Sequence, residues 1–327
     1  MKLLTFKLKN SNKDRFGFVF EDKIIDINKC AEWIKDNKNN ASFNRIPSTL
    51  TDSLKDWDVN LSLLIEMNEL IKDSDVKKFS FLSSEIIFLP PVPNPPSFRD
   101  FYAFEQHVMA ARKLRGLEMN PDWYKIPIFY FSNPNCCYGH KQEIPYPKQT
   151  DELDFELEFA IIVGNGGINI DSSDAEQYIA GYTILNDWSA RDLQREEMPM
   201  SLGPAKGKDF LTTLGPYIIT KDELDDKCIR GEFGNRYDLN MYAYLNGELL
   251  SKDNFKNISW TFAQIISRIS DGTEIYPGDV IGSGTCATGC LLELNQTNNT
   301  NIWINDGDEI KLVIDKMGSL VNTIKFV

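Results

Sequence analysis

The chain has 327 residues, enough for one large domain or two modest ones, and its 35 Lys and Arg against 48 Asp and Glu give a formal net charge of −13. This charge disfavours a non-specific nucleic-acid binder and a protein that binds an anionic membrane surface, because both need a basic face. Hydrophobic residues make up 42% of the chain and charged residues 25%, so it can bury a core, and no apolar run approaches the length of a membrane span.

The N-terminus and the cysteines indicate a cytoplasmic protein. Lys2, Lys7 and Lys9 interrupt any apolar stretch, which argues against a signal peptide. None of the six cysteines forms a CxxC pair, so we expect free thiols in a reducing compartment and no zinc ribbon. His107 and His140 are the two histidines of the chain, so any histidine chemistry must use one of them.

Residues 1–89 are predicted to form a small α+β domain. Residues 16–20 and 24–27 flank a polar turn and predict a hairpin, and the apolar spacing in residues 61–72 predicts a mostly buried helix. The segment 90–96 holds five prolines and is extended and semi-rigid, as at a domain boundary. We therefore place a second domain at residues 90–327.

The second domain is predicted to be rich in strands. Helical patterns are few and cover residues 100–114, 188–197 and 261–270. Strand-like runs separated by Gly, Pro and Asn cover residues 153–163, 217–220, 239–245, 279–283, 301–304, 309–314 and 320–327, and residues 296–300 read as a polar loop. Many strands with few helices indicate a β-rich α+β fold.

The first chemical motif is an alternating run in residues 153–163. On a strand, Asp154, Glu156 and Glu158 share one face and the apolar residues share the other. Two interpretations stay open at this point. The acids either face water on an edge strand, or they form a hard-cation site in which a divalent metal relieves their repulsion.

Two further motifs place acids beside other functional groups. Asp187, Arg191 and Gln194 are spaced at i, i+4 and i+7 and share a helical face, either as a simple salt bridge or as a metal acid with two substrate donors. Asp100 and His107 also share a face if their segment is helical, and His107 is the better placed of the two histidines to act as a base.

The remaining motifs are two glycine-containing segments. Residues 203–210 lack the spacing of a phosphate-binding P-loop, so the segment is either a solvated turn or a loop that delivers Lys206 or Lys208 to an anionic substrate. Residues 281–289 bring backbone close to another group or form a bulged strand. Glu293 follows as a lone acid among apolar residues, which predicts a buried partner.

Together these segments resemble the fumarylacetoacetate hydrolase family. The resemblance rests on RDFYAFEQH, LDFELEFA, NDWSARDLQ, GPAKGKDF and GSGT…LLEL, which occur in the family order, and it covers the chain from about residue 90 to the C-terminus. It implies a mixed β-roll or barrel with a small N-terminal α+β domain. It also implies a homodimer and a role in aromatic amino-acid catabolism.

The resemblance further implies a divalent metal, Mg²⁺ or alternatively Ca²⁺ or Mn²⁺. Its carboxylate ligands are Asp100, Glu156, Glu158 and Asp187, whereas Asp154 is not a ligand in the family. Four monodentate oxygens leave two positions of an octahedron open, which the two oxygens of a 1,3-dioxo acid can fill.

The other implied roles concern water and substrate. His107 and Glu293 resemble the water-activating pair, in which Glu293 orients the imidazole, and Lys208, Arg191 and Gln194 stabilise the oxyanion and the substrate carboxylate. The further implied substrate contacts are Tyr102, Tyr130 and Thr285.

Departures from the family pattern concern the substrate. Gly116 stands where the fumarylacetoacetate-cleaving members have an arginine, with Arg112 and Arg115 nearby but offset. A tyrosine of those members is replaced near Met198, the loop to Lys208 is one residue longer, and the chain is shorter than the full-length eukaryotic enzymes.

Three functions follow from these residues. The leading one is hydrolysis of a C–C bond in a diketo acid such as fumarylacetoacetate, fumarylpyruvate or an acylpyruvate. The second is a lyase of the same family, an oxaloacetate decarboxylase or a 2-oxopent-4-enoate hydratase, for which the His107–Glu293 pair is less essential. The third is a metal-stabilised binding module without chemistry, which the intact acids and the intact pair disfavour.

Overall fold

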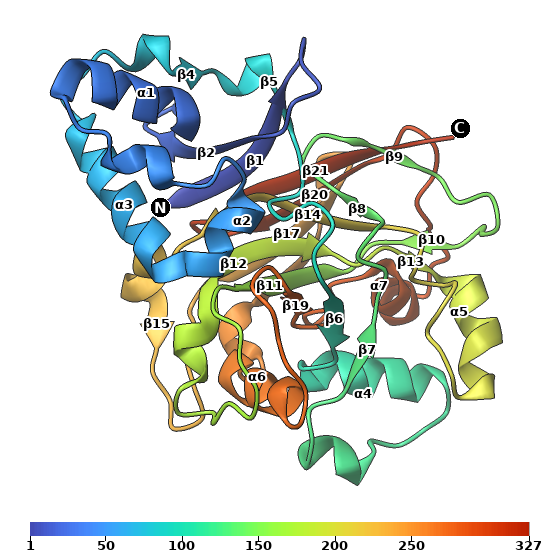
Figure 1. Ribbon diagram of the computed structural model, residues 1–327. Helices are drawn as coiled ribbons and strands as arrows, with labels where there is room; N and C mark the ends of the chain where they lie inside the picture. The colour runs from blue at the N-terminus through green and yellow to red at the C-terminus, as the bar shows by residue number, and fades with distance from the viewer. Residues whose placement is uncertain (327) are drawn as a thin grey trace.

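The computed structural model describes residues 1–326 and shows a sheet-rich α+β architecture (Figure 1). The helices are α1 (Ile27–Lys38), α2 (Leu50–Ser53), α3 (Trp57–Leu70), α4 (Glu105–Leu114), α5 (Arg191–Glu197), α6 (Phe262–Ser270) and α7 (Leu291–Asn298). The strands are β1 (Lys2–Leu8), β2 (Arg15–Phe20), β3 (Lys23–Asp26), β4 (Ser80–Phe81), β5 (Ile86–Phe88), β6 (Phe98–Phe101), β7 (Phe129–Phe131), β8 (Cys137–Tyr138), β9 (Glu143–Pro145), β10 (Leu153–Asp154), β11 (Leu157–Val163), β12 (Ile179–Asn186), β13 (Ser189–Ala190), β14 (Thr212–Ile219), β15 (Cys228–Ile229), β16 (Arg236–Tyr237), β17 (Asn240–Leu245), β18 (Glu248–Asn254), β19 (Val280–Gly282), β20 (Glu309–Ile314) and β21 (Gly318–Lys325).

The N-terminal region is a small antiparallel sheet covered by helices. The predicted hairpin is confirmed as β2 and β3, and the predicted helix is confirmed as α3, which begins four residues earlier than expected. Asp26 ends β3 and caps α1, because its side chain accepts a hydrogen bond from the amide of Lys29 at 3.1 Å. α1 and α3 pack with β1, β2 and β3 in one hydrophobic cluster (Figure 1).

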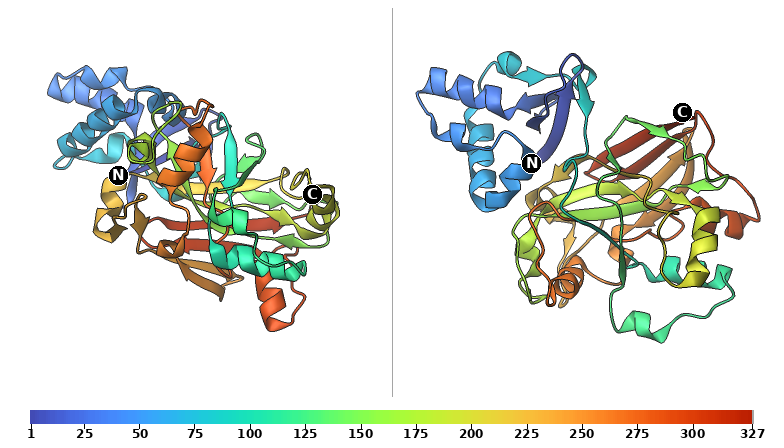
Figure 2. Two further views of the ribbon diagram at one scale, coloured as in Figure 1. Left: turned by 90° about the horizontal axis from the view of Figure 1, so that it is seen from below. Right: turned by 45° about the vertical axis from the view of Figure 1, so that its right-hand side comes forward.

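The N-terminal sheet is continuous with the main sheet of the second region. β1 pairs antiparallel with β14, so that the order β4-β3-β2-β1-β14-β12-β11-β19-β6-β7 runs through both regions in one 12-stranded sheet. The proline segment packs against this junction, where Thr5 Oγ1 donates to the carbonyl of Pro91 at 2.7 Å and Val92 is buried. Figure 2 shows the N-terminal region at one side of the molecule, with β1 at its inner edge.

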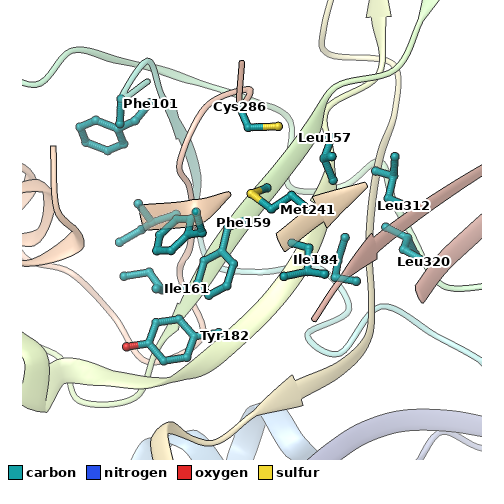
Figure 3. Close-up of a cluster of buried hydrophobic side chains, with 14 of the residues drawn as sticks. Phe101, Leu157, Phe159, Ile161, Tyr182, Ile184, Met241, Cys286, Leu312 and Leu320 are labelled. Carbon is teal, nitrogen blue, oxygen red and sulfur yellow. The ribbon is translucent and has the colours of Figure 1, made fainter. Parts of the chain in front are cut away.

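The main core lies between the large sheet and a second sheet of order β18-β17-β20-β21-β9. Leu157, Phe159 and Ile161 of β11 alternate with residues on the opposite face and point toward Met241 and Leu312 of the second sheet (Figure 3). All five are fully buried. The predicted β-rich α+β class is confirmed, in the form of a roll of two packed sheets.

Several predicted element boundaries were wrong. The run 153–163 is two strands interrupted at residues 155–156, the helix expected at 100–114 begins at Glu105, and the helix expected at 188–197 begins at Arg191. Asp100 therefore lies on β6 and Asp187 precedes α5. Asp100 is paired with Gly282 in the large sheet, and Asp187 follows the last paired residue of β12. Pairing in the sheet therefore decides the backbone conformation at these positions, although the spacing of the residues predicted helices.

Two C-terminal predictions also differ. The loop expected at 296–300 is partly the last turn of α7, and residues 301–304 form no strand. The backbone amide of Ile302 binds the Asn295 side chain at 2.9 Å, and that of Ile304 binds the carbonyl of Leu153 at 3.0 Å. These groups are satisfied without a β-ladder, so the apolar spacing of this segment did not produce a strand. No helix within residues 1–326 combines the length and hydropathy that crossing a membrane requires.

Candidate active site

The four acids expected to bind metal come from three neighbouring strands. Asp100 lies on β6, Glu156 directly precedes β11, Glu158 is the second residue of β11, and Asp187 directly follows β12. β19 pairs with both β6 and β11, and β11 pairs with β12, so these strand ends meet in one place. One carboxylate oxygen from each acid lies within 4.8 Å of the others, and all four side chains are buried.

The strand between them makes room for these carboxylates. A Cβ atom on Gly282 of β19 would lie 2.2 Å from Asp100 Oδ1 and 2.9 Å from Glu158 Oε2. The amide of Gly284 donates to the same two oxygens, at 3.2 Å each. Glu158 Oε1 and Asp187 Oδ1 are buried without a hydrogen-bond partner in the described chain. Free, buried and converging oxygens fit a hard divalent cation.

The pKa values of Asp100 and Glu158 are raised by the same cause. Burial raises the pKa of Asp100 to about 8, and the charge of Asp187 adds to that rise. Burial raises the pKa of Glu158 well above its usual value, with the charges of Asp100 and Asp187 next in importance. Mutual repulsion of buried carboxylates is the condition that a bound cation relieves.

Lys208 lies among these acids, while the contact with substrate that the resemblance implies stays a prediction. Its Nζ atom is 2.5 Å from Glu156 Oε2 and 2.5 Å from Asp187 Oδ2, and Tyr130 also donates to Asp187 Oδ2. Burial opposes the charge of Lys208, but Asp187 and Glu156 raise its pKa above the usual value. Lys206 of the same loop is exposed and pairs with Asp209 at 2.8 Å, so the loop delivers one ammonium group to the site.

Arg191 is held inside a network of protein groups. Its Nη2 atom donates to Glu156 Oε1 at 2.7 Å, its Nε to Asp154 Oδ2 at 2.8 Å, and its Nη1 to Gln194 Oε1 at 2.9 Å. Burial would raise the pKa of Glu156, but the charges of Lys208 and Arg191 outweigh it, so this pKa lies below its usual value. The structure thus shows that Arg191 orients an acid of the cluster, while its contact with substrate stays a prediction.

Asp154 has a role that sequence reasoning missed. Its carboxylate accepts hydrogen bonds from the amides of Leu291 and Leu292 at 2.7 and 3.0 Å, so it caps the N-terminus of α7 while it pairs with Arg191. The alternation of residues 153–163 grouped Asp154 with the metal acids. No local pattern relates it to a helix more than 130 residues later in the chain.

The histidine and glutamate expected to activate water lie together. His107 of α4 forms a hydrogen bond through Nδ1 with Glu293 Oε1 of α7, and Glu293 Oε2 accepts from the amide of Thr288 at 2.9 Å. Both side chains are buried. Tyr102 packs edge-on against His107 with ring centroids 5.5 Å apart, and burial raises the pKa of Tyr102 to about 12. Glu293 therefore has the partner that its isolated position predicted.

A cavity of about 360 Å³ lies between residues 130–133 and the loop that carries Lys208. Tyr130 and Lys208, which both contact the acid cluster, line it together with Leu202 and Asn133. Thr285, the last expected substrate contact, is buried in the segment after β19. The four acids do not line this cavity, so Tyr130 and Lys208 are the residues that connect it to the acid cluster.

Comparisons with known proteins identify the family of this chain. The family model described as "Fumarylacetoacetate (FAA) hydrolase C-terminal" matches residues 97–325. A fumarylacetoacetase from Arabidopsis thaliana is 30% identical over 308 residues, which cover 76% of this chain and 72% of the relative. The oxaloacetate tautomerase YisK from Bacillus subtilis is 24% identical over 324 residues, which cover 97% of this chain and 100% of the relative.

Among solved structures, a maleylpyruvate hydrolase from Sphingobium sp. SYK-6 in complex with manganese (II) ion and pyruvate has the same fold. Its TM-score is 0.68 at 20% sequence identity, covering 100% of this chain and 99% of that chain.

Proposed function

The chain belongs to the fumarylacetoacetate hydrolase family, and we propose that it is a metal-dependent hydrolase that cleaves a C–C bond in a diketo acid. One observation carries the proposal: a buried His–Glu pair lies near a cluster of four buried acids, close enough that the charge of His107 contributes to the lowered pKa of Glu156. The named relatives include hydrolases and a tautomerase, so the particular reaction rests on this site and not on the family alone.

The proposed site holds a divalent metal through Asp100, Glu156, Glu158 and Asp187. Mg²⁺, Mn²⁺ or Ca²⁺ bound there supplies Lewis-acid polarisation of the substrate oxygens. Gly282 leaves the space that the carboxylates occupy. Arg191 fixes the orientation of Glu156 through its Nη2 contact at 2.7 Å.

The His107–Glu293 pair moves the protons of the proposed reaction. Glu293 accepts the Nδ1–H of His107, which leaves the Nε2 lone pair to take a proton from the attacking water. The resulting imidazolium is stabilised by the Glu293 carboxylate. After the C–C bond breaks, the carbon that leaves as an enolate regains a proton from His107 Nε2, which restores the starting state.

Lys208 is placed to stabilise negative charge. Its ammonium group is buried and already close to the carboxylates of Glu156 and Asp187. A substrate oxygen that becomes anionic at this position gains a charged hydrogen-bond donor in a site of low dielectric constant. Tyr130 lines the cavity together with Lys208, and its hydroxyl donates to Asp187 Oδ2.

A second candidate is a reaction on oxaloacetate, such as tautomerisation or decarboxylation. The oxaloacetate tautomerase YisK matches this chain over its whole length, and Gly116 replaces the arginine expected in a fumarylacetoacetate-cleaving enzyme. Such a reaction needs an enolate and a proton carrier, but no attack by water on a carbonyl carbon.

A substrate panel with metal and with chelator distinguishes the two candidates. Fumarylacetoacetate, fumarylpyruvate, acetylpyruvate and oxaloacetate are each assayed with Mg²⁺, Mn²⁺ or EDTA, by loss of absorbance and by identification of the products. Metal-dependent formation of two cleavage products supports the hydrolase. Turnover of oxaloacetate alone would contradict the hydrolase and support the second candidate.

Substitutions in the site test the assigned roles. We expect His107→Ala to retain Mn²⁺ binding but to lose about 10²–10⁴-fold in hydrolysis, because its imidazole carries the proton and is not a ligand. His140→Gln is the matched control, since His140 lies outside the site. Unchanged turnover in His107→Ala would show that His107 does not activate the water.

A further inference from the structure

Cys290 lies beside the His107–Glu293 pair. It is the N-cap residue of α7, and Glu293 follows it at i+3, so both project toward the same side of the helix start. α4, which carries His107, packs against α7. A ring nitrogen of His107, the Sγ atom of Cys290 and a carboxylate oxygen of Glu293 all lie within 4.8 Å of one another.

This cluster differs from the acid cluster in its donor atoms. The acid cluster offers oxygen only, which suits hard cations such as Mg²⁺ and Ca²⁺. Nitrogen, sulfur and oxygen from three buried side chains suit a borderline or soft cation, for which thiolate and imidazole are the preferred ligands. One chain thus carries two neighbouring clusters that select different ions.

We propose that His107, Cys290 and Glu293 form a second metal site, which binds a thiophilic divalent cation such as Zn²⁺ and inhibits the enzyme when it is filled. Three protein ligands leave the fourth position of a tetrahedral zinc ion to water, as in catalytic zinc sites. The inhibitory part rests on the proposed function, because it needs His107 to act as the base.

The charges and protons of this binding step balance. Cys290 is fully buried, and burial raises the pKa of its thiol well above the usual value, so the free site holds S–H. When the cation binds, a metal–sulfur bond replaces the S–H bond, and one proton leaves to solvent. The thiolate and the Glu293 carboxylate then neutralise the two positive charges, while His107 binds as the neutral imidazole.

Inhibition follows from the tautomer that the cation imposes on His107. A cation held by His107 and Glu293 replaces the Nδ1–Glu293 hydrogen bond that orients the imidazole. With Nδ1 bound to the cation, the neutral imidazole carries its proton on Nε2, which then cannot accept one from water. The acids are not part of this cluster, so the hard cation stays bound. Excess Mg²⁺ is therefore expected not to relieve inhibition by Zn²⁺.

Cadmium binding tests the site without reference to activity. The full chain is saturated with Mg²⁺ and titrated with Cd²⁺, and the thiolate-to-cadmium charge-transfer absorbance is recorded together with proton release in weak buffer. We expect one equivalent of Cd²⁺ to give the band and to release one proton. Cys290→Ser should lose the band and weaken binding at least about tenfold.

Cys286→Ser is the matched control, because Cys286 is also fully buried and lies four residues away but outside the cluster. It should keep the band and the stoichiometry of the unsubstituted chain. An unchanged band in Cys290→Ser, or its loss in Cys286→Ser alone, would overturn the assignment. If Cys290→Ser fails to fold, ¹¹³Cd NMR of the unsubstituted chain decides, because a signal from oxygen ligands only would contradict the proposal.

The activity assay separates this proposal from the proposed function. With a turned-over substrate, Cys290→Ser should retain basal activity and need at least about tenfold more Zn²⁺ for half-inhibition. A chain that shows the cadmium band but no hydrolysis would retain the metal site and refute only the hydrolase. Hydrolysis with no cadmium band would refute the metal site and leave the hydrolase intact.

Discussion

At the scale of single residues, Gly282 permits the acid cluster to form. Its hydrogen atom faces Asp100 Oδ1 and Glu158 Oε2, and any side chain would occupy the space of those oxygens. The neighbouring Gly284 has φ +80° and would bring a Cβ atom within 2.5 Å of the carbonyl of Phe101. These glycines hold open a small volume in which two carboxylates approach the backbone of β19.

Gly282→Ala is therefore expected to weaken Mn²⁺ binding at least about tenfold, which corresponds to about 1.4 kcal/mol. The added methyl group would stand 2.2 Å from Asp100 Oδ1, so that carboxylate must move. Calorimetric titration of Mn²⁺ measures the effect. Gly231→Ala, at an exposed position between β15 and β16, serves as the control, and an unchanged affinity in Gly282→Ala would show that Asp100 does not contribute to the site.

At the scale of elements, His140 ties the segment before β9 to β21. Its Nδ1 atom accepts a hydrogen bond from the amide of Val321 at 3.1 Å, and its ring meets that of Phe88 on β5 edge-on at 4.9 Å. Burial, with a smaller effect from the charge of Lys141, lowers the pKa of His140 from 6.5 to about 4. The acceptor role requires the neutral ring, so geometry and pKa agree.

This pKa shift predicts a loss of stability at low pH. Between pH 6.5 and about 4 the unfolded chain binds a proton at His140 and the folded chain does not, so the free energy of unfolding falls as the pH is lowered. The contribution is on the order of 3 kcal/mol, at about 1.4 kcal/mol per pH unit. Urea unfolding of the chain and of His140→Gln across this range measures it. Equal slopes in both proteins would contradict the prediction.

At the scale of the whole molecule, residues 1–89 and the second region share one sheet and part of one core. Leu214 and Ile218 of β14 and Ile162 of β11 pack in the same hydrophobic cluster as Leu3 and Leu63 of the N-terminal region. The boundary predicted at residue 90 thus crosses a continuous sheet. The homodimer stays a prediction, which light scattering in solution would test.

Deletion of residues 1–89 is expected to leave the remainder unable to fold stably. It removes the partner strand of β14 and exposes apolar residues of the shared core, which favours aggregation. Soluble yield and thermal unfolding of residues 90–327 measure this. Co-expression with residues 1–89 should restore the fold, and a truncated chain that unfolds at the temperature of the full chain would refute the prediction.

The amino-acid sequence by itself determined the fold class, the family and the set of acids that the structure brings together. Asp100, Glu156, Glu158 and Asp187 lie in separate short motifs, and the occurrence of these motifs together in the family order identified the set. The alternating residues of β11 likewise predicted a strand with a buried apolar face.

Only the tertiary structure decided how these motifs meet. His107 and Glu293 form a pair although they are 186 residues apart in the chain. The packing of α4 on α7 also places Cys290 beside them. Arg191 is engaged by Asp154 and Glu156 because sheet and loop pairing place all three in one buried network. The physical reason is that periodicity describes one element at a time, whereas distances between elements depend on non-local strand register and core packing.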